Sequence, residues 1–254
     1  MNTNYATDVL QVVKLGKYYQ LKYLSTYRLG GFEETCNFGI GDDLIPLKPV
    51  SFKNNDYKLS NNISRAITTC RNIALSNEWD YFITLTLDSE KYDRFDLSKF
   101  HKDLSSFFKY LNRKFTCCIK YLLVPERHKN GAWHMHGLIR GIPLSCLSIN
   151  DNGFLSFIPY SNKFGYCSLS PVVSSVAVSL YITKHLSKQI KSGVIDLGQH
   201  LYYHSRGLDH GVTIALLPAT KLPDNFVFQY ESEDKSYKSS FFEDSSFLSD
   251  LGLI

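Results

Sequence analysis

The chain has 254 residues, 44% of them hydrophobic and 20% charged, which is enough for one sizeable core, or for one catalytic domain with additions at both ends. No apolar run is long enough to span a bilayer, since the longest, around 172–182, is interrupted by serines and a tyrosine. The N-terminus also lacks the positive-then-apolar order of a secretory signal. We therefore expect a soluble, cytoplasmic protein with no membrane partner.

The net charge of +4 is unevenly distributed along the chain. Residues 223–254 carry seven acidic residues and two lysines, a balance of −5, so the first 222 residues carry +9. A basic body favours a polyanionic partner, because each phosphate that it neutralises releases counterions. An ordinary solvated surface would show the same charge, so this feature alone does not identify nucleic acid.

Residues 1–60 contain short runs of β-branched and aromatic residues separated by glycines, as in QVVKL and YYQLKYLSTYRL. Such runs are typical of strands joined by turns. A helix is expected next, over 60–79, with Ser60 or Asn62 as its N-terminal cap. Its apolar residues near helical spacing are Ile63, Ala66, Ile67 and Ile73.

The middle of the chain predicts a strand, a helix and a hairpin. YFITLTLD at 81–88 is typical of a buried strand, and a helix is expected over 97–115 with Asp96 as its cap. Two further strands, 117–126 and 132–142, are joined by the turn RHKNG. The apolar positions of the helix fall at helical intervals: Leu97, Phe100, Leu104, Phe107, Phe108 and Leu111.

Residues 143–170 predict an irregular stretch that leads into a helix at about 172–191. QHLYYHSRGL is expected to form a strand or turn, and GVTIALLP one more strand. This order predicts an α+β fold with helices on one face of an antiparallel sheet. The expected division is a β-rich extension at 1–60, a central domain at 61–222 and an acidic tail at 223–254, partly ordered or ordering on a partner.

The motif WHMHGLI contains two histidines that can share one metal ion. His134 and His136 are two residues apart on a predicted strand, so their side chains project from the same face. If RHKNG closes a hairpin, Glu126 lies on the adjacent strand beside them. Two imidazoles and one carboxylate would leave open positions, which suits Mg²⁺ or Mn²⁺ better than structural zinc. His128 is a rival ligand that the turn is expected to carry away, and a simple hydrogen-bonded surface pair is the alternative.

The motif SLYITKHLSKQIK contains a candidate nucleophile. On a helix, Tyr181, Lys184 and Lys188 stand at i, i+3 and i+7, on one face. A free tyrosine has a pKa of about 10 and attacks poorly unless nearby positive charge stabilises its phenolate. The alternative is that Tyr181 packs in the core together with its apolar neighbours, while the lysines are solvated.

The ordered motifs FITLTLD, ERHKNGAWHMHGLI and YITKHLSK together resemble the HUH superfamily of rolling-circle replication initiators. The similarity is greatest to the phage- and plasmid-type replication-associated proteins of bacteria, and it spans roughly residues 60–210. The sequence departs from many relatives at His185, where they carry a second tyrosine. A mechanism that alternates two tyrosines is therefore in doubt, and Tyr181 remains as a single nucleophile.

The resemblance implies an RRM-like or ferredoxin-like antiparallel sheet and a metal-dependent DNA endonuclease that joins itself to the cut strand. It implies His134, His136 and Glu126 as metal ligands, and Tyr181 with Lys184 and Lys188 as catalytic residues. The expected substrate is single-stranded origin DNA, and a host helicase and polymerase are expected partners, because the chain has no G-x-x-x-x-G-K-[ST] loop. Residues expected to contact DNA are Lys129, Arg140 and Arg206, and more weakly Trp133.

Three other functions fit parts of this pattern. A relaxase or transposase with a single tyrosine would share the chemistry and serve the mobility of an element. A non-catalytic RRM-like module would bind nucleic acid without changing it. A structural metalloprotein would hold zinc tightly and cut nothing.

Overall fold

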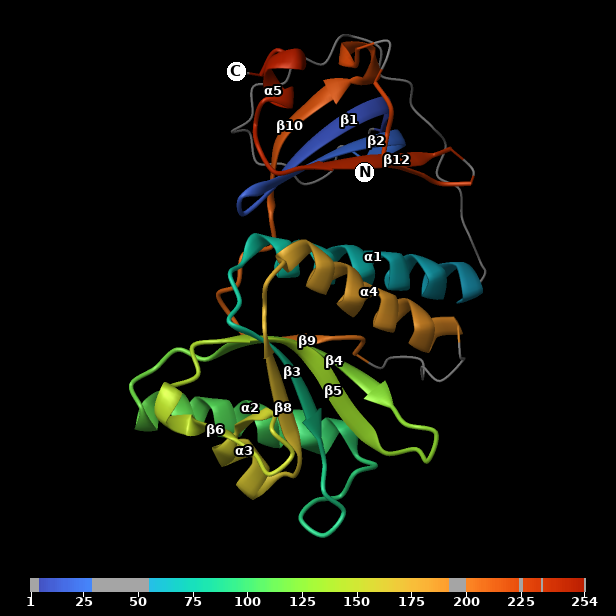
Figure 1. Cartoon of the computed structure of the whole chain (residues 1–254). Helices are drawn as coiled ribbons and strands as arrows, with labels where there is room; N and C mark the ends of the chain where they lie inside the picture. The colour runs from blue at the N-terminus through green and yellow to red at the C-terminus, as the bar shows by residue number, and fades with distance from the viewer. Residues whose placement is uncertain (1–4, 29–54, 192–199, 224–225, 234, 254) are drawn as a thin grey trace. The chain divides into compact units, whose positions relative to one another are not determined.

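The structure is a computed structural model that describes residues 5–28, 55–191, 200–223, 226–233 and 235–253. The chain divides into two compact units. One unit combines Met1–Asn54 with His210–Ile254, and the other is Asn55–Asp209 (Figure 1). The fold is mixed α+β with two antiparallel sheets, as the order of predicted elements indicated.

The division into two units differs from the three segments expected from the sequence, 1–60, 61–222 and 223–254. Strand β10 (Val212–Pro218) pairs with β1 (Tyr5–Leu15), and β12 (Tyr237–Phe242) pairs with β2 (Tyr18–Arg28). The two ends of the chain therefore share one sheet, because backbone hydrogen bonds join strands that are far apart in sequence.

The first unit is built on a five-stranded sheet in the order β10-β1-β2-β12-β11. Strands β1 and β2 form a long hairpin whose turn contains Gly16 at φ 61°, a conformation that glycine adopts without strain. The acidic C-terminal segment supplies β11 (Tyr230–Glu231), β12 and the short helix α5 (Phe247–Asp250). These elements form because the segment buries apolar side chains against the hairpin, among them Leu10, Val12, Leu21, Phe247, Leu248 and Leu251.

The second unit is built on a seven-stranded antiparallel sheet in the order β6-β7-β8-β3-β5-β4-β9. Its strands are β3 (Tyr81–Thr86), β4 (Lys120–Arg127), β5 (Trp133–Arg140), β6 (Leu147–Ile149), β7 (Leu155–Phe157), β8 (Cys167–Pro171) and β9 (Tyr203–His204). The two predicted strands that flank RHKNG are thus β4 and β5, at the centre of the sheet beside β3.

The helices of this unit are α1 (Asn55–Ser76), α2 (Leu97–Lys114), α3 (Ile158–Lys163) and α4 (Ser175–Lys191). Asp96 caps α2 as predicted, since its carboxylate accepts a hydrogen bond from the Lys99 amide. The predicted start of α1 at Ser60 or Asn62 was wrong, because the helix already begins at Asn55. Residues 143–170 are also more regular than expected: three short strands, α3 and the 3-10 turn Leu144–Cys146 lie in or begin in this stretch.

The sheet of the second unit is covered on both faces, whereas the sequence predicted helices on one face only (Figure 1). Helix α2 packs its apolar stripe against one face, over Ile83, Leu85 and Met135. Helices α1 and α4 cover the other face. Their contact residues form a second core: Cys70, Ile73, Ala74 and Ile182 from the helices, with Leu122, Val124 and Leu138 from the strands. Both faces need cover because β4 and β5 carry buried residues on each of their sides.

Across the helices that the structure describes, none combines the length and apolar character of a membrane span.

Gly137 occupies a position in β5 where a side chain has no space. A Cβ atom there would overlap the carbonyl oxygen of Leu122 and would lie 2.8 Å from the Leu123 Cα. We predict that Gly137→Ala lowers the free energy of unfolding by roughly 1–3 kcal/mol, because backbone must shift to make room. Urea denaturation measures this change, with Ser148→Ala on the exposed edge strand β6 as the control. Equal midpoints for the two variants would contradict the prediction.

Candidate metal and nucleophile site

The register of the β4–β5 hairpin places three candidate ligands side by side. Glu126 on β4 lies directly opposite His134 on β5, and Val124 lies opposite His136. Residues opposite each other in an antiparallel pair project from the same face. The turn is held by His128, whose amide donates to the Ala132 carbonyl at 2.9 Å. The hairpin predicted from RHKNG therefore exists and brings the carboxylate to the imidazoles.

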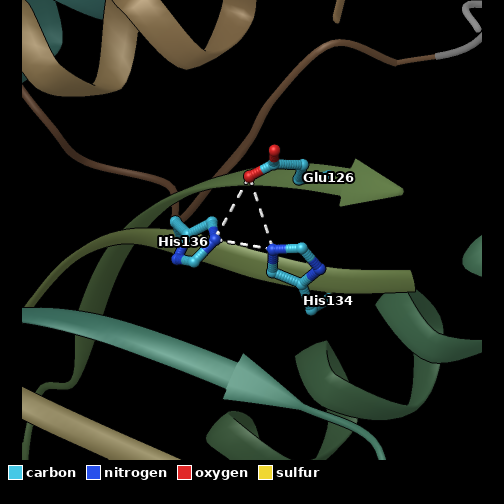
Figure 2. A group of neighbouring side chains, drawn as sticks. All are labelled: Glu126, His134 and His136. Carbon is cyan, nitrogen blue, oxygen red and sulfur yellow. Dashed lines mark hydrogen bonds and ion pairs between the residues drawn. The ribbon is translucent and has the colours of Figure 1, made fainter. Parts of the chain in front are cut away.

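The three side chains converge on one point (Figure 2). The Nε2 atoms of His134 and His136 are 2.6 Å apart, and they lie 3.4 Å and 3.3 Å from one Glu126 carboxylate oxygen. All three ligand atoms lie within 4.8 Å of one another. Two nitrogens and an oxygen that face a common centre are the arrangement that a divalent cation requires.

Contacts with β3 fix the ring of His136. Its Nδ1 atom lies 3.1 Å from the Thr84 hydroxyl, which leaves Nε2 to face Glu126 and His134. The ring also stacks on Phe82, with centroids 6.1 Å apart and planes inclined by 15°. A hydrogen bond to the far nitrogen of a ligating histidine orients the ring and fixes its tautomer.

His134 is fixed by packing. It is buried, and its Nδ1 atom has no hydrogen-bond partner among the residues that the structure describes. The ring of His128 packs against it, with centroids 3.9 Å apart and planes inclined by 32°. The turn was expected to carry His128 away from the site. The structure instead keeps it beside His134, although it is not one of the three converging ligands.

The environment of His134 favours its neutral form. Burial, and then the neighbouring His136 and His128, lower its pKa to about 4, against the opposing effect of Glu126. A neutral imidazole is the form that binds metal ions, because the coordinating lone pair is not occupied by a proton. The site therefore presents His134 ready to ligate at neutral pH.

This donor set fits a divalent ion. Its three ligands leave coordination positions open, as a catalytic site needs and a closed structural zinc site does not. The free Nε2 atoms point inward, and at least one ring is held from behind by a hydroxyl. The structure therefore supports a possible metal group of two histidines and one glutamate, without indicating which ion it prefers.

Helix α4 presents Tyr181 outside the core. Ser174 precedes the helix and its hydroxyl accepts a hydrogen bond from the Ala177 amide, as a cap does. Ile182, one residue after the tyrosine, is buried against the sheet, whereas Tyr181 is 46% exposed. Adjacent residues on a helix point about 100° apart, so burying Ile182 turns Tyr181 toward solvent. The alternative in which Tyr181 is a core residue does not describe this helix.

Phe82 connects the tyrosine to the histidines. The Tyr181 ring meets the Phe82 ring edge-on at 5.3 Å, and Phe82 in turn stacks on His136. The phenol and the metal group therefore lie on the same face of the sheet and share a neighbour. Lys184 is exposed on the same helix, one turn further on, while the side chain of Lys188 lies outside the described residues.

The candidate DNA contacts fall at opposite ends of the hairpin. Lys129 is exposed in the β4–β5 turn, next to the metal group. Arg140 lies at the far end of β5, six residues or roughly 20 Å from His134. Arg206 is at that same far end, because its carbonyl accepts a hydrogen bond from Lys120, the register partner of Arg140. Trp133 is buried in the α2-side core under Arg127, so its ring is not free to stack on a base.

The sequence analysis assigned no role to Phe82 or Thr84, although it identified the strand that carries them. The alternation in FITLTLD contained the signal. Ile83, Leu85 and Leu87 are the buried residues of the α2-side core, so Phe82 and Thr84 must project from the histidine face.

Comparison with known proteins identifies one family. Residues 80–190 match the family model for the replication-associated protein ORF2. The matched segment runs from β3 to α4, so it contains the histidine pair, the glutamate and the tyrosine helix. The family resemblance inferred from the three motifs is thereby confirmed over this segment. No curated protein and no solved structure matches the chain.

We predict that Thr84→Val weakens Mn²⁺ binding by roughly tenfold or more, because His136 loses the hydroxyl that orients its ring. Isothermal titration calorimetry measures the affinity. Thr86→Val is a matched control on the same strand and face, because in the described part of the chain the Thr86 hydroxyl bonds neither histidine. If both variants bind Mn²⁺ like the native protein, the Thr84 hydroxyl does not orient the ligand.

Proposed function

Starting from the match of residues 80–190 to the replication-associated protein ORF2 family, we propose that this protein is a rolling-circle replication initiator that nicks single-stranded origin DNA. One observation carries the proposal: an exposed tyrosine and a two-histidine, one-glutamate group lie on one face of the sheet and share Phe82 as a neighbour. A nucleophile next to a candidate metal group is what metal-assisted cleavage of a phosphodiester needs.

In this proposal His134, His136 and Glu126 hold a Mg²⁺ or Mn²⁺ ion through their converging nitrogens and carboxylate. When bound, such an ion polarises the scissile phosphate and offsets the negative charge that develops during the reaction. Phe82 and Thr84 keep the His136 ring in position, and the burial of His134 keeps water away from one side of the group.

Tyr181 acts as the nucleophile. Its phenolic oxygen attacks phosphorus, so a new P–O bond to tyrosine forms as the bond from phosphorus to the 3′ oxygen breaks. The products are a 5′-phosphotyrosine link and a free 3′ hydroxyl. The exposure of Tyr181 supports this role, because a DNA strand can reach the phenol from solvent. The link conserves one phosphodiester bond, so a later attack by a 3′ hydroxyl rejoins the strand.

Lys184 and Lys188 supply positive charge on the nucleophile's helix. At i+3 and i+7 they stand above Tyr181 on one helical face. An ammonium group near the phenol stabilises the phenolate, and it can neutralise the phosphate or give a proton to the leaving oxygen. His185 replaces the second tyrosine of many relatives, so one tyrosine performs both nicking and rejoining.

The free 3′ hydroxyl would prime DNA synthesis by a host polymerase, with a host helicase to unwind the duplex. Lys129, Arg140 and Arg206 would contact the DNA backbone along the hairpin, from the metal end to the far end. A relaxase or transposase with the same tyrosine chemistry remains the nearest alternative. A non-catalytic binding module is less well supported, because it gives no reason for an exposed tyrosine beside a histidine–glutamate group.

We predict that the protein forms a covalent adduct with labelled single-stranded DNA from its own replicon in the presence of Mg²⁺ or Mn²⁺. The adduct would migrate with the protein on a denaturing gel. Tyr181→Phe should abolish it, a loss of several orders of magnitude, because the attacking oxygen is gone. His134→Ala should abolish it as well, through loss of a metal ligand.

Tyr110→Phe is a matched control for this experiment. Tyr110 is a 51% exposed tyrosine on a helix, and Lys114 lies over its ring, but it sits on α2, which covers the opposite face of the sheet. Its removal should leave the adduct unchanged. If native protein binds the DNA but forms no adduct with either metal, the nicking function fails and the binding module becomes the better account.

A further inference from the structure

A hollow of about 550 Å³ lies beside the metal group, between the loop that follows β3 and the β4–β5 turn (Figure 1). Its residues come from these two segments, which are held together by a 2.8 Å hydrogen bond from the Trp133 amide to the Arg94 carbonyl. The lining consists of Thr86, Leu87, Arg94, His128, Lys129, Asn130, Ala132 and Trp133. The mechanism proposed above assigns this hollow no role.

The charge inside the hollow is positive and uncompensated. Arg94 and Lys129 both line it, and neither forms an ion pair with any residue in the described ranges. The Nε atom of Arg94 is buried without a hydrogen-bond partner in that part of the chain. A buried guanidinium nitrogen without a partner is costly, so it indicates that an anionic ligand completes the site.

The acidic residues of the same loop do not neutralise this charge, because they are engaged elsewhere and none lines the hollow. Asp88 accepts a hydrogen bond from the Glu90 amide and faces Lys91 at 3.9 Å. Asp93 accepts from the Phe95 amide, and Asp96 caps α2. The two cations in the hollow therefore remain available to a ligand.

The hollow adjoins the metal group directly. His128 lines it and also packs on His134, and Thr86 lines it while pairing with His134 across β3 and β5. Phe95, 58% exposed, lies at the rim, since a Cβ on Gly131 in the turn would touch its ring. Cationic groups beside an exposed aromatic ring are what single-stranded nucleic acid binds, through its phosphates and its bases respectively.

We propose that this hollow binds the backbone of single-stranded DNA next to the scissile phosphate, with Arg94 and Lys129 contacting phosphate oxygens and Phe95 stacking on a base. The inference rests on the proposed function for the identity of its ligand. It adds to that function a site that fixes the position of the strand relative to the metal group. Its position beside His134 leads the strand across the ligands toward Tyr181.

The test is the salt dependence of binding to fluorescein-labelled oligo(dT), measured by fluorescence anisotropy with the full chain in EDTA, so that no cleavage occurs. Each lost phosphate contact lowers the slope of log affinity against log salt by about 0.7 for single strands. We expect this change in Arg94→Ala and in Lys129→Ala, and we expect Arg94→Lys to retain the native slope. Phe95→Ala should weaken binding severalfold with no change in slope, because stacking releases no counterions.

Lys109→Ala is the matched control, since Lys109 is an exposed lysine on α2, over the opposite face of the sheet. It should keep the native affinity and slope. Native slopes in both Arg94→Ala and Lys129→Ala would overturn the proposal, as would a native protein that does not bind oligo(dT). Because Lys129 is an exposed turn residue, its variant tests the hollow even if Arg94→Ala fails to fold.

The adduct experiment distinguishes a failure of this proposal from a failure of the proposed function. A native protein that forms the tyrosine adduct, while both charge variants keep the native slope, would retain its nicking function and lose the hollow as a DNA site. A native protein that forms no adduct, while both variants show the reduced slope, would retain the hollow as a DNA site and lose the nicking function.

Discussion

The register of the β4–β5 hairpin is the constraint on which the candidate site depends. Because Glu126 lies opposite His134, and His136 is two residues further along the same strand, three ligands meet on one face of the sheet. A shift of one residue in this pairing would turn one strand's side chains to the other face. Gly137 contributes to the same register, since β4 approaches its Cα too closely for any side chain.

The two apolar cores position the other half of the site. Because α2 covers one face of the sheet, α1 and α4 are left to cover the histidine face. The burial of Ile182 in that second core fixes the rotation of α4, and this rotation exposes Tyr181 next to Phe82. The nucleophile is therefore positioned by an aliphatic neighbour that takes no part in the chemistry.

Burial and exposure are divided among the functional groups in a way that suits their proposed tasks. His134 is buried and held in its neutral form, as a ligand should be, whereas Tyr181 and Lys184 face solvent, from which a DNA strand would arrive. The hollow lined by Arg94 and Lys129 extends this surface past the metal group. A strand bound along it would contact positive charge before and beside the ligands.

The sequence by itself determined the local features: the α+β class, the cap at Asp96, the hairpin at RHKNG, and the pairing of His134, His136 and Glu126. These follow from periods of two and 3.6 residues and from turn chemistry, which act over a few neighbours. Only the tertiary structure decided that Tyr181 is exposed, that Phe82 and Thr84 support His136, and that the chain ends share a sheet. Those outcomes depend on which distant segments pack together, because contacts between residues far apart leave no periodic signal in the sequence.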